Sequence, residues 1–374
     1  MKKWLALLSV LFLVGCSLFI VGCSKKEAQA PSADASVATP EAIAESVPAG
    51  EKQKLVIYNW TEYLPETVLE AFTKETGIEV EYATYESNEA MYAKLKLLGG
   101  KGYDIVVPST FYVEKMRKEG LLQPINKTAL KNYINLDASA MNKVHDPDNQ
   151  YSVPYLWGST AIAINGNNVD ASKIKKWADL WKPEYVGKIM LMDDVRDNFY
   201  IGLRVCGFND NSTNEAEIKC AFEKLKALMP SVKTFNSDSP KTPLIQGNVS
   251  IGAIWNGEAY KASQEMENLQ YVYPEEGAVI WIDSFVIPQG AVNIDAAHKF
   301  IDFMLRAESG KACIEELGYP APNTAATLLL DEKLRNNKMV FPSKEDVARG
   351  SIHTDVGEAG LMYLKYWDLL KAGR

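Results

Sequence analysis

At residues 55–62 the chain reads LVIYNWTE, an apolar run that ends in a tryptophan and a carboxylate. The run 55–59 predicts a β-strand. Side chains at positions i and i+2 of a strand point the same way, so Trp60 and Glu62 are expected to face a common space. An indole face beside a carboxylate suits an organic ammonium ion, because the ring attracts the cation and the carboxylate accepts a charge-assisted hydrogen bond.

The same pairing of a tryptophan with an acid recurs twice. Trp255 ends an apolar run and precedes Glu258 by three residues, and Trp281 precedes Asp283 by two residues within another apolar run. Three such pairs indicate a cleft for a cationic amine. The alternative for each pair is a core tryptophan beside a solvated acid at a strand end, and the sequence leaves that alternative open for any single pair.

Predicted strands and helices alternate along the rest of the chain, which is typical of an α/β fold with largely parallel sheets. In such sheets ligands bind beyond the carboxyl ends of the strands, and Ser109 and Asp194, like Trp60 and Trp255, follow predicted strand ends. A turn is expected at Trp157-Gly158. The predicted strands are 55–59, 78–82, 103–107, 159–164, 189–192, 249–254 and 279–287, and the predicted helices are 65–76, 90–98, 196–205, 215–229, 296–305, 310–317 and 358–371.

The start of the chain is typical of an export signal, with Lys2 and Lys3 ahead of a long apolar run. The stretches LVGC (13–16) and IVGC (20–23) both resemble the lipobox of bacterial lipoproteins, in which the cysteine carries the lipid. We expect a signal peptide over residues 1–22 and lipidation of Cys23, because cleavage before the alternative Cys16 would leave an apolar segment exposed. The other interpretation is an uncleaved membrane anchor. Either one places the chain outside the cytoplasm and tethers it to a membrane.

Residues 23–53 are predicted to be the lipidated N-terminus and a flexible tether, because they contain scarcely any large apolar side chain. The remainder, about 320 residues, suffices for two lobes. The formal net charge is −8, and loss of Lys2 and Lys3 with the signal peptide brings it to −10. An acidic exported protein is a poor nucleic-acid binder and can collect cations.

Three cysteines, Cys206, Cys220 and Cys313, lie beyond residue 53, so at least one is unpaired. Cys206 and Cys220 flank a polar loop between two predicted helices and can form a disulfide outside the cytoplasm. We favour separate buried thiols as the simpler interpretation.

Six motifs follow one another along the chain: YNWTEY (58–63), YESNE (85–89), DIVVPS (104–109), WADLWKPEY (177–185), IWNG (254–257) and LGYP (317–320). Together they resemble the substrate-binding subunit of bacterial spermidine/putrescine ABC importers, closest to the spermidine-preferring type. The resemblance extends from about Leu55 to Arg374. It implies a two-lobe periplasmic-binding-protein fold with the ligand cleft between the lobes, lobe 1 comprising residues 54–159 and 282–330 and lobe 2 residues 160–281 and 331–374.

The resemblance also implies a polyamine ligand, delivery to an ABC permease with its ATPase, and no cofactor or metal. A polyamine alternates cationic nitrogens with short alkyl spacers, so its receptor must alternate carboxylates with apolar walls. The residues that the resemblance assigns to the cleft are Trp60, Thr61, Glu62, Tyr63 and Ser109 on one wall, Asp194 and Asp197 from the other lobe, Trp255, Trp281 and Tyr319 around the channel, and Asp283 near its middle.

Four further observations bear on which polyamine is bound. Phe111 stands where the spermidine type has a tyrosine, and Asp197 replaces a glutamate. His353 replaces a glutamine, so it would repel an ammonium if protonated and accept a hydrogen bond if neutral. Glu258 replaces a serine, and the putrescine-preferring relatives carry an acid there. Glu258 can instead form an ion pair across the cleft, and Asp194 can instead cap a helix. We expect spermidine to be preferred, with putrescine close behind.

Other classes of function explain the sequence less well. Paired carboxylates such as Asp194 with Asp197 would suit a glycosidase, but the chain has no nucleophile elbow, phosphate loop or two-histidine metal motif, so no enzyme is expected. A metal-binding surface protein is a second alternative. The acidic segment 146–150, however, lacks the glycine and the glutamate of a calcium-binding loop, so a turn is expected there. A polyamine sensor for a membrane receptor would have the same lobes, and the sequence leaves sensing and uptake both open.

Overall fold

The computed structural model describes residues 53–373, and these residues fall within one compact unit. The expected signal peptide, the lipobox cysteines Cys16 and Cys23 and nearly all of the tether lie outside the described residues. Within residues 53–373, no helix combines the length and apolar character needed to cross a bilayer.

One mixed β-sheet runs through this unit, in the order β2-β1-β3-β10-β5-β8-β6-β7, with β4, β9 and β11 attached at the side. Neighbouring strands are parallel in β2-β1-β3 and in β8-β6-β7, and antiparallel where β3, β10, β5 and β8 meet. The expectation of a largely parallel sheet is therefore wrong for the middle, where two long strands run in opposite directions. The strands are β1 (Lys54–Trp60), β2 (Glu79–Tyr85), β3 (Ile105–Val106), β4 (Leu122–Gln123), β5 (Ser152–Asn165), β6 (Ile189–Leu191), β7 (Val232–Phe235), β8 (Ile251–Trp255), β9 (Leu269–Val272), β10 (Val279–Pro288) and β11 (Ser351–Ile352).

Helices cover both parallel parts of the sheet. We call β1, β2 and β3 with α1 to α3 the first lobe, and β6, β7 and β8 with α4 to α7 the second lobe. The helices are α1 (Glu66–Thr76), α2 (Asn88–Leu97), α3 (Thr110–Lys118), α4 (Val195–Cys206), α5 (Glu215–Leu228), α6 (Lys241–Ile245), α7 (Asn256–Glu265), α8 (Ile294–Met304), α9 (Ala307–Leu317), α10 (Thr324–Leu328), α11 (Glu332–Arg335), α12 (Lys344–Arg349) and α13 (Gly360–Ala372).

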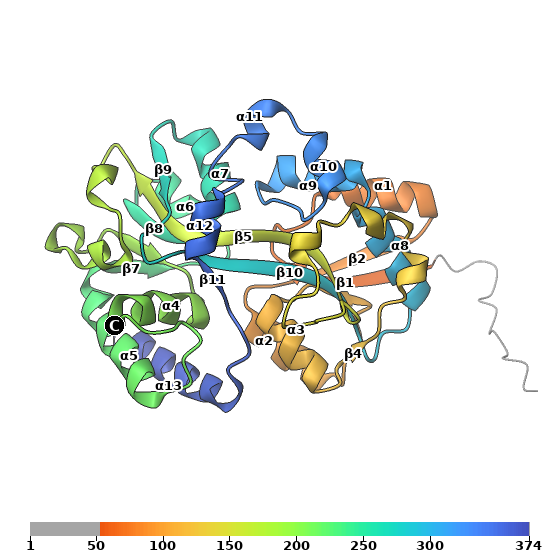
Figure 1. Cartoon of the computed structure of the whole chain (residues 1–374), viewed down its shortest axis with the longest axis horizontal. Helices are drawn as coiled ribbons and strands as arrows, with labels where there is room; N and C mark the ends of the chain where they lie inside the picture. The colour runs from red at the N-terminus through yellow and green to blue at the C-terminus, as the bar shows by residue number, and fades with distance from the viewer. Residues whose placement is uncertain (1–52, 374) are drawn as a thin grey trace, which may run out of the picture. The chain divides into compact units, whose positions relative to one another are not determined.

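Strands β5 and β10 connect the two lobes, as Figure 1 shows across the middle of the ribbon. The expected turn at Trp157-Gly158 is wrong, because β5 passes straight through both residues. Gly158 is required there, since a Cβ atom would lie 2.5 Å from Cζ2 of Trp281 on β10. The predicted lobe boundaries after residues 159 and 281 fall inside these two strands and remain a prediction.

The first β-α-β unit follows the sequence pattern closely. β1 buries alternate side chains such as Leu55 and Ile57, and α1 packs Phe72 against the Phe300 ring of α8 at a centroid distance of 5.1 Å. α1 ends at Gly77, whose φ of 71° lies in the left-handed region that a helix C-cap favours. Pro65 is the N-cap, with an extended ψ of 132°, and not the first helical residue as expected.

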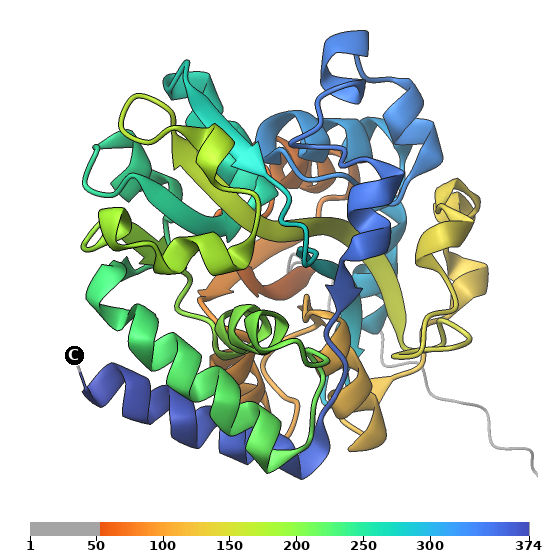
Figure 2. The ribbon, with the colours of Figure 1, turned by 60° about the vertical axis from the view of Figure 1, so that its left-hand side comes forward.

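In the second lobe, α13 lies along α5 (Figure 2). Tyr363 and Trp367 of α13 are buried in a core shared with Phe199 of α4 and Leu225 of α5, so this last helix is held by its aromatic face. α13 therefore packs against the second lobe through α4 and α5.

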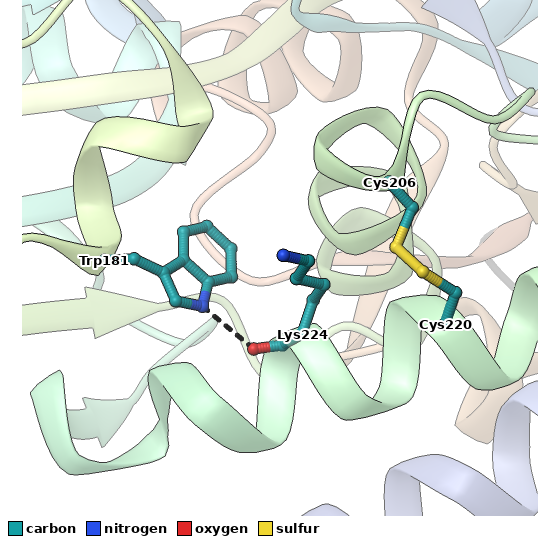
Figure 3. Close-up of a disulfide and its surroundings, with 4 residues drawn as sticks. All are labelled: Trp181, Cys206, Cys220 and Lys224. Carbon is teal, nitrogen blue, oxygen red and sulfur yellow. Dashed lines mark hydrogen bonds between the residues drawn. A yellow bond between two sulfur atoms is a disulfide. The ribbon is translucent and has the colours of Figure 1, made fainter.

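Cys206 and Cys220 form a disulfide that joins the end of α4 to α5 (Figure 3), with their Cα atoms 6.5 Å apart. The preference for separate thiols is therefore wrong. The loop after α4 turns the chain back so that α5 runs beside α4, which brings the two side chains together. Trp181 packs at the same helix, where its Nε1 donates to the Lys224 carbonyl at 2.9 Å. Cys313 is the free, buried thiol of the described residues.

Candidate functional site

All fourteen predicted site residues line one cavity between the lobes. They come from seven places in the chain: the end of β1, the start of α3, the start of α4, the β8–α7 junction, β10, the segment after α9, and the segment after β11. Asn88, Thr110 and Asp238 line it as well and were missed by the sequence analysis. Asn88 belongs to the motif 85–89, whereas nothing in the sequence singles out Asp238.

Aromatic rings form the walls of this cavity. The Trp60 and Trp255 rings meet edge to face across it, with centroids 6.0 Å apart. Tyr319 lies 5.4 Å from the Tyr63 ring and 5.3 Å from the Trp281 ring. The Trp60 indole is oriented by a 3.0 Å hydrogen bond from its Nε1 to the Val107 carbonyl.

The tryptophan–acid pairs reach the cavity in different ways. Trp281 and Asp283 both lie on β10 and both line the cavity, in agreement with the strand argument. β1, however, ends at Trp60, and Glu62 sits in a turn with a φ of 51°. The expectation that a strand face carries Trp60 and Glu62 together is therefore wrong, although the turn brings both to the cavity.

Asp283 is a buried carboxylate held by a chain of polar side chains. Its Oδ1 accepts from the Ser109 hydroxyl at 2.6 Å, and Asn88 donates to Ser109 Oγ at 3.1 Å. Burial raises the pKa of Asp283 to about 7, against the opposing effects of Ser109 and Tyr63. A carboxylate that is costly to ionise in isolation is stabilised when a cation reaches it.

Asp194 and Asp197 form a second acidic pair at the start of α4. Asp194 caps this helix by accepting from the Asp197 amide at 2.9 Å, so the capping alternative holds for Asp194, which also lines the cavity. Asp197 accepts from the Thr160 hydroxyl at 2.6 Å. Burial raises the pKa of Asp194 to about 7, with Asp197 adding to it, and burial raises the pKa of Asp197 to about 6.

His353 faces the same pair in its neutral form. Burial and the nearby Arg196 guanidinium lower its pKa to about 3. Its Nε2 lies 3.2 Å from Asp197 Oδ1, and when Asp197 is ionised Nε2 carries the hydrogen and donates it to the carboxylate. Nδ1 is then an acceptor that is buried without a hydrogen-bond partner among residues 53–373. The Phe111 ring lies against the imidazole, with a centroid distance of 5.7 Å.

Glu62 and Glu258 are paired with two lysines that the sequence analysis missed. Lys241 Nζ lies 3.0 Å from Glu62 Oε2 and 3.4 Å from Glu258 Oε2. Lys261 Nζ lies 3.1 Å from Glu258 Oε1 and 4.0 Å from Glu62 Oε2. Glu258 is therefore ion-paired, but with lysines of its own lobe and not across the cleft as expected; the pair that joins the two lobes is Glu62–Lys241.

The cavity brings carboxylates and aromatic ring faces together. This combination of side chains suits a ligand that carries ammonium groups on an alkyl chain. Among the described residues, no cluster of histidine, cysteine or acidic side chains has the arrangement of a metal site.

Comparisons with known proteins agree with this geometry. The sequence pattern of the bacterial extracellular solute-binding protein family matches residues 67–342. The spermidine/putrescine-binding periplasmic protein of Escherichia coli (strain K12) is 50% identical over 326 residues, which cover 87% of this chain and 94% of that protein.

Two solved structures have the same fold. The spermidine/putrescine ABC transporter substrate-binding protein PotD of Streptococcus pneumoniae superimposes with a TM-score of 0.73 at 38% identity, covering 86% of this chain and 99% of that one. The Tp0655 (TpPotD) lipoprotein of Treponema pallidum superimposes with a TM-score of 0.76 at 29% identity, covering 85% and 99%. The fold is thus the two-lobe fold of periplasmic binding proteins. The chain belongs to the bacterial extracellular solute-binding proteins and, within them, to the family of spermidine/putrescine-binding proteins of ABC transporters, which are binding proteins and not enzymes.

Proposed function

We propose that this chain captures spermidine or putrescine in the cavity between its lobes, outside the cytoplasm, and delivers it to the permease and ATPase of an ABC importer. The observation that carries the proposal is that three carboxylates, Asp194, Asp197 and Asp283, line one cavity together with aromatic rings. Burial raises the pKa of each, and an ammonium ion beside it would stabilise the ionised form. The names of the relatives support the polyamine class.

Each part of the cavity has a role in this proposal. The carboxylates pair with ammonium groups, and the ring faces cover the alkyl spacers, where each buried methylene contributes about 0.8 kcal/mol and each cation–ring contact roughly 0.5–2 kcal/mol. Neutral His353 offers Nδ1 as an acceptor for an ammonium hydrogen. The neutral form is the favourable one of the two protonation states considered for this residue. The rings are Trp60, Tyr63, Trp255, Trp281 and Tyr319, with Phe111 beside His353.

Isothermal titration calorimetry of the purified full chain tests this proposal. Putrescine, spermidine and spermine are titrated beside γ-aminobutyrate and glucose. We expect saturable binding of at least one polyamine and none of the amino acid or the sugar. Saturable heat from glucose with none from any polyamine would refute the proposal. Uptake is then separated from sensing by deleting the gene and measuring accumulation of labelled polyamine, which should fall if the chain serves a permease.

We also propose that the chain is anchored to a membrane by a lipid on Cys23. The lipobox at residues 20–23 supports this, and a structural relative is itself named a lipoprotein. Metabolic labelling with palmitate should be lost in Cys23→Ala and kept in Cys16→Ala. The reverse pattern would assign the lipid to Cys16.

A further inference from the structure

Lys241 is a cation paired with two acids, Glu62 and Glu258, that line one end of the cavity. It is the first residue of α6 in the second lobe, and its Nζ contacts Glu62, which follows β1 in the first lobe, as well as Glu258 of α7. The Lys241 side chain is only 17% exposed and that of Glu258 only 7%. The ammonium group therefore lies between two carboxylates at a place where the two lobes meet.

All four members of this cluster, Glu62, Lys241, Glu258 and Lys261, are held in charged pairs. The hydrogen bond from Lys241 lowers the pKa of Glu62. Burial opposes the charge on Lys241, but Glu258 and Glu62 together raise its pKa above the usual value. Two carboxylates and two ammonium groups leave the cluster without net charge, so neither acid has a negative charge left for a ligand amine.

The charge that remains for a ligand is set by the other end of the cavity. Asp194, Asp197, Asp238 and Asp283 are the carboxylates that line the rest of the cavity, and the buried Arg196 guanidinium favours the ionised state of Asp194 and Asp197. Arg196 donates to the Thr354 carbonyl and to Asn211 Oδ1, so it is fixed in place by neutral partners. These acids are therefore the ones left for a ligand, whereas Glu62 and Glu258 are already matched by two lysines.

We propose that Lys241 occupies the position of one ligand ammonium, at the Glu62–Glu258 end of the cavity, and thereby shifts the preference of the site from a triamine toward a diamine. The inference deepens the proposed function and depends on it. It also changes the meaning of Glu258, which the sequence analysis counted as an extra acid for the ligand. Glu258 instead completes the binding site of a side-chain ammonium.

Lys241→Met tests the inference, because methionine keeps an unbranched apolar stem and removes the charge. The affinities of putrescine and spermidine are measured by calorimetry on the full chain. We expect the ratio of spermidine to putrescine affinity to rise at least tenfold, since the cluster gains one net negative charge and Glu62 loses its 3.0 Å partner, while Lys261 stays paired with Glu258. The matched control is Lys311→Met, which removes a lysine from an exposed pair with Glu315 on α9 and should leave the ratio unchanged.

A second variant should change the ratio of spermidine to putrescine affinity in the opposite direction. It keeps the inference testable if Lys241→Met does not fold. Glu258→Gln leaves Lys241 and Lys261 with a surplus positive charge, so spermidine should weaken more than putrescine. Suppose that the wild-type chain binds both ligands and that Lys241→Met leaves the affinity ratio unchanged or weakens both ligands equally. That result would overturn the inference and leave the proposed function standing. A wild-type chain that binds no polyamine would overturn the proposed function itself, and the inference with it.

Discussion

Asp283 shows how a single side chain is prepared for a cation. Ser109 holds its carboxylate on the wall of the cavity, and the Trp281 ring lies two residues before it on the same strand. Burial without a counter-ion raises its pKa to about 7. The residue is therefore destabilised in the ionised state that a polyamine requires, and the ligand supplies the missing charge.

Asp283→Asn should weaken polyamine binding at least tenfold, about 1.4 kcal/mol, while the fold persists. The amide keeps the shape of the side chain and can still accept from Ser109, but it cannot balance an ammonium group. Calorimetry gives the affinity and thermal unfolding the stability. Asp295→Asn, which changes an exposed acid in the first turn of α8, is the matched control. Unaltered affinity in Asp283→Asn would remove this residue from the binding site.

Helix α4 has a structural role at one end and a proposed binding role at the other. The disulfide lies at the C-terminal end of α4, whereas Asp194 and Asp197 lie at its N-terminal end. The double variant Cys206→Ala/Cys220→Ala should lower the free energy of unfolding by about 3 kcal/mol, as loop-closure entropy predicts for a separation of about 15 residues. Ligand affinity should change little.

Thermal unfolding with and without reductant checks this, together with thiol labelling of the denatured chain. Among the cysteines beyond residue 53, labelling should reach Cys206 and Cys220 only after reduction, and Cys313 without it. Equal labelling before and after reduction would show that the bridge does not form in solution.

Much of the fold could be predicted from local patterns, and the rest depends on contacts that are distant in sequence. The apolar run 55–59 predicted β1, and the helix predicted at 65–76 matches α1 to within one residue at its start. The antiparallel middle of the sheet was missed because β5 and β10 pair across more than a hundred residues. A turn was predicted at Trp157-Gly158, although Gly158 lies within β5, where the lack of a Cβ atom lets Trp281 pack against the backbone.

The residues that line the cavity were predicted more fully than the ion pairs that some of them form. All fourteen residues line the cavity, because matched motifs and tryptophan–acid spacing identify side chains one at a time. Lys241 and Lys261 were missed since nothing near them in the sequence distinguishes them from surface lysines. Only the approach of α6 and α7 to the turn after β1 brings them to Glu62.

Across the whole molecule, we expect binding of a polycation to be coupled to proton release. The pKa of Asp194 and of Asp283 is raised to about 7 and that of Asp197 to about 6, each chiefly by burial. A folded pKa above the unfolded value means that the unliganded fold holds extra protons from about pH 4 to 7, so these groups make it less stable as the pH rises through that window. A ligand that requires the ionised carboxylates must displace those protons.

Affinity for a polyamine should therefore fall more than tenfold between about pH 8 and about pH 5.5, because protonation of the three carboxylates competes with the ligand. His353 stays neutral throughout this range, with its pKa lowered to about 3, so it adds no repulsion. Calorimetry at about pH 6.5 in two buffers of different ionisation enthalpy counts the protons released on binding. We expect at least one, and fewer in Asp283→Asn than in the wild-type chain. Binding heats that do not depend on the buffer would show that the carboxylates are already ionised before the ligand arrives, and the coupling between cavity and proton would then be absent.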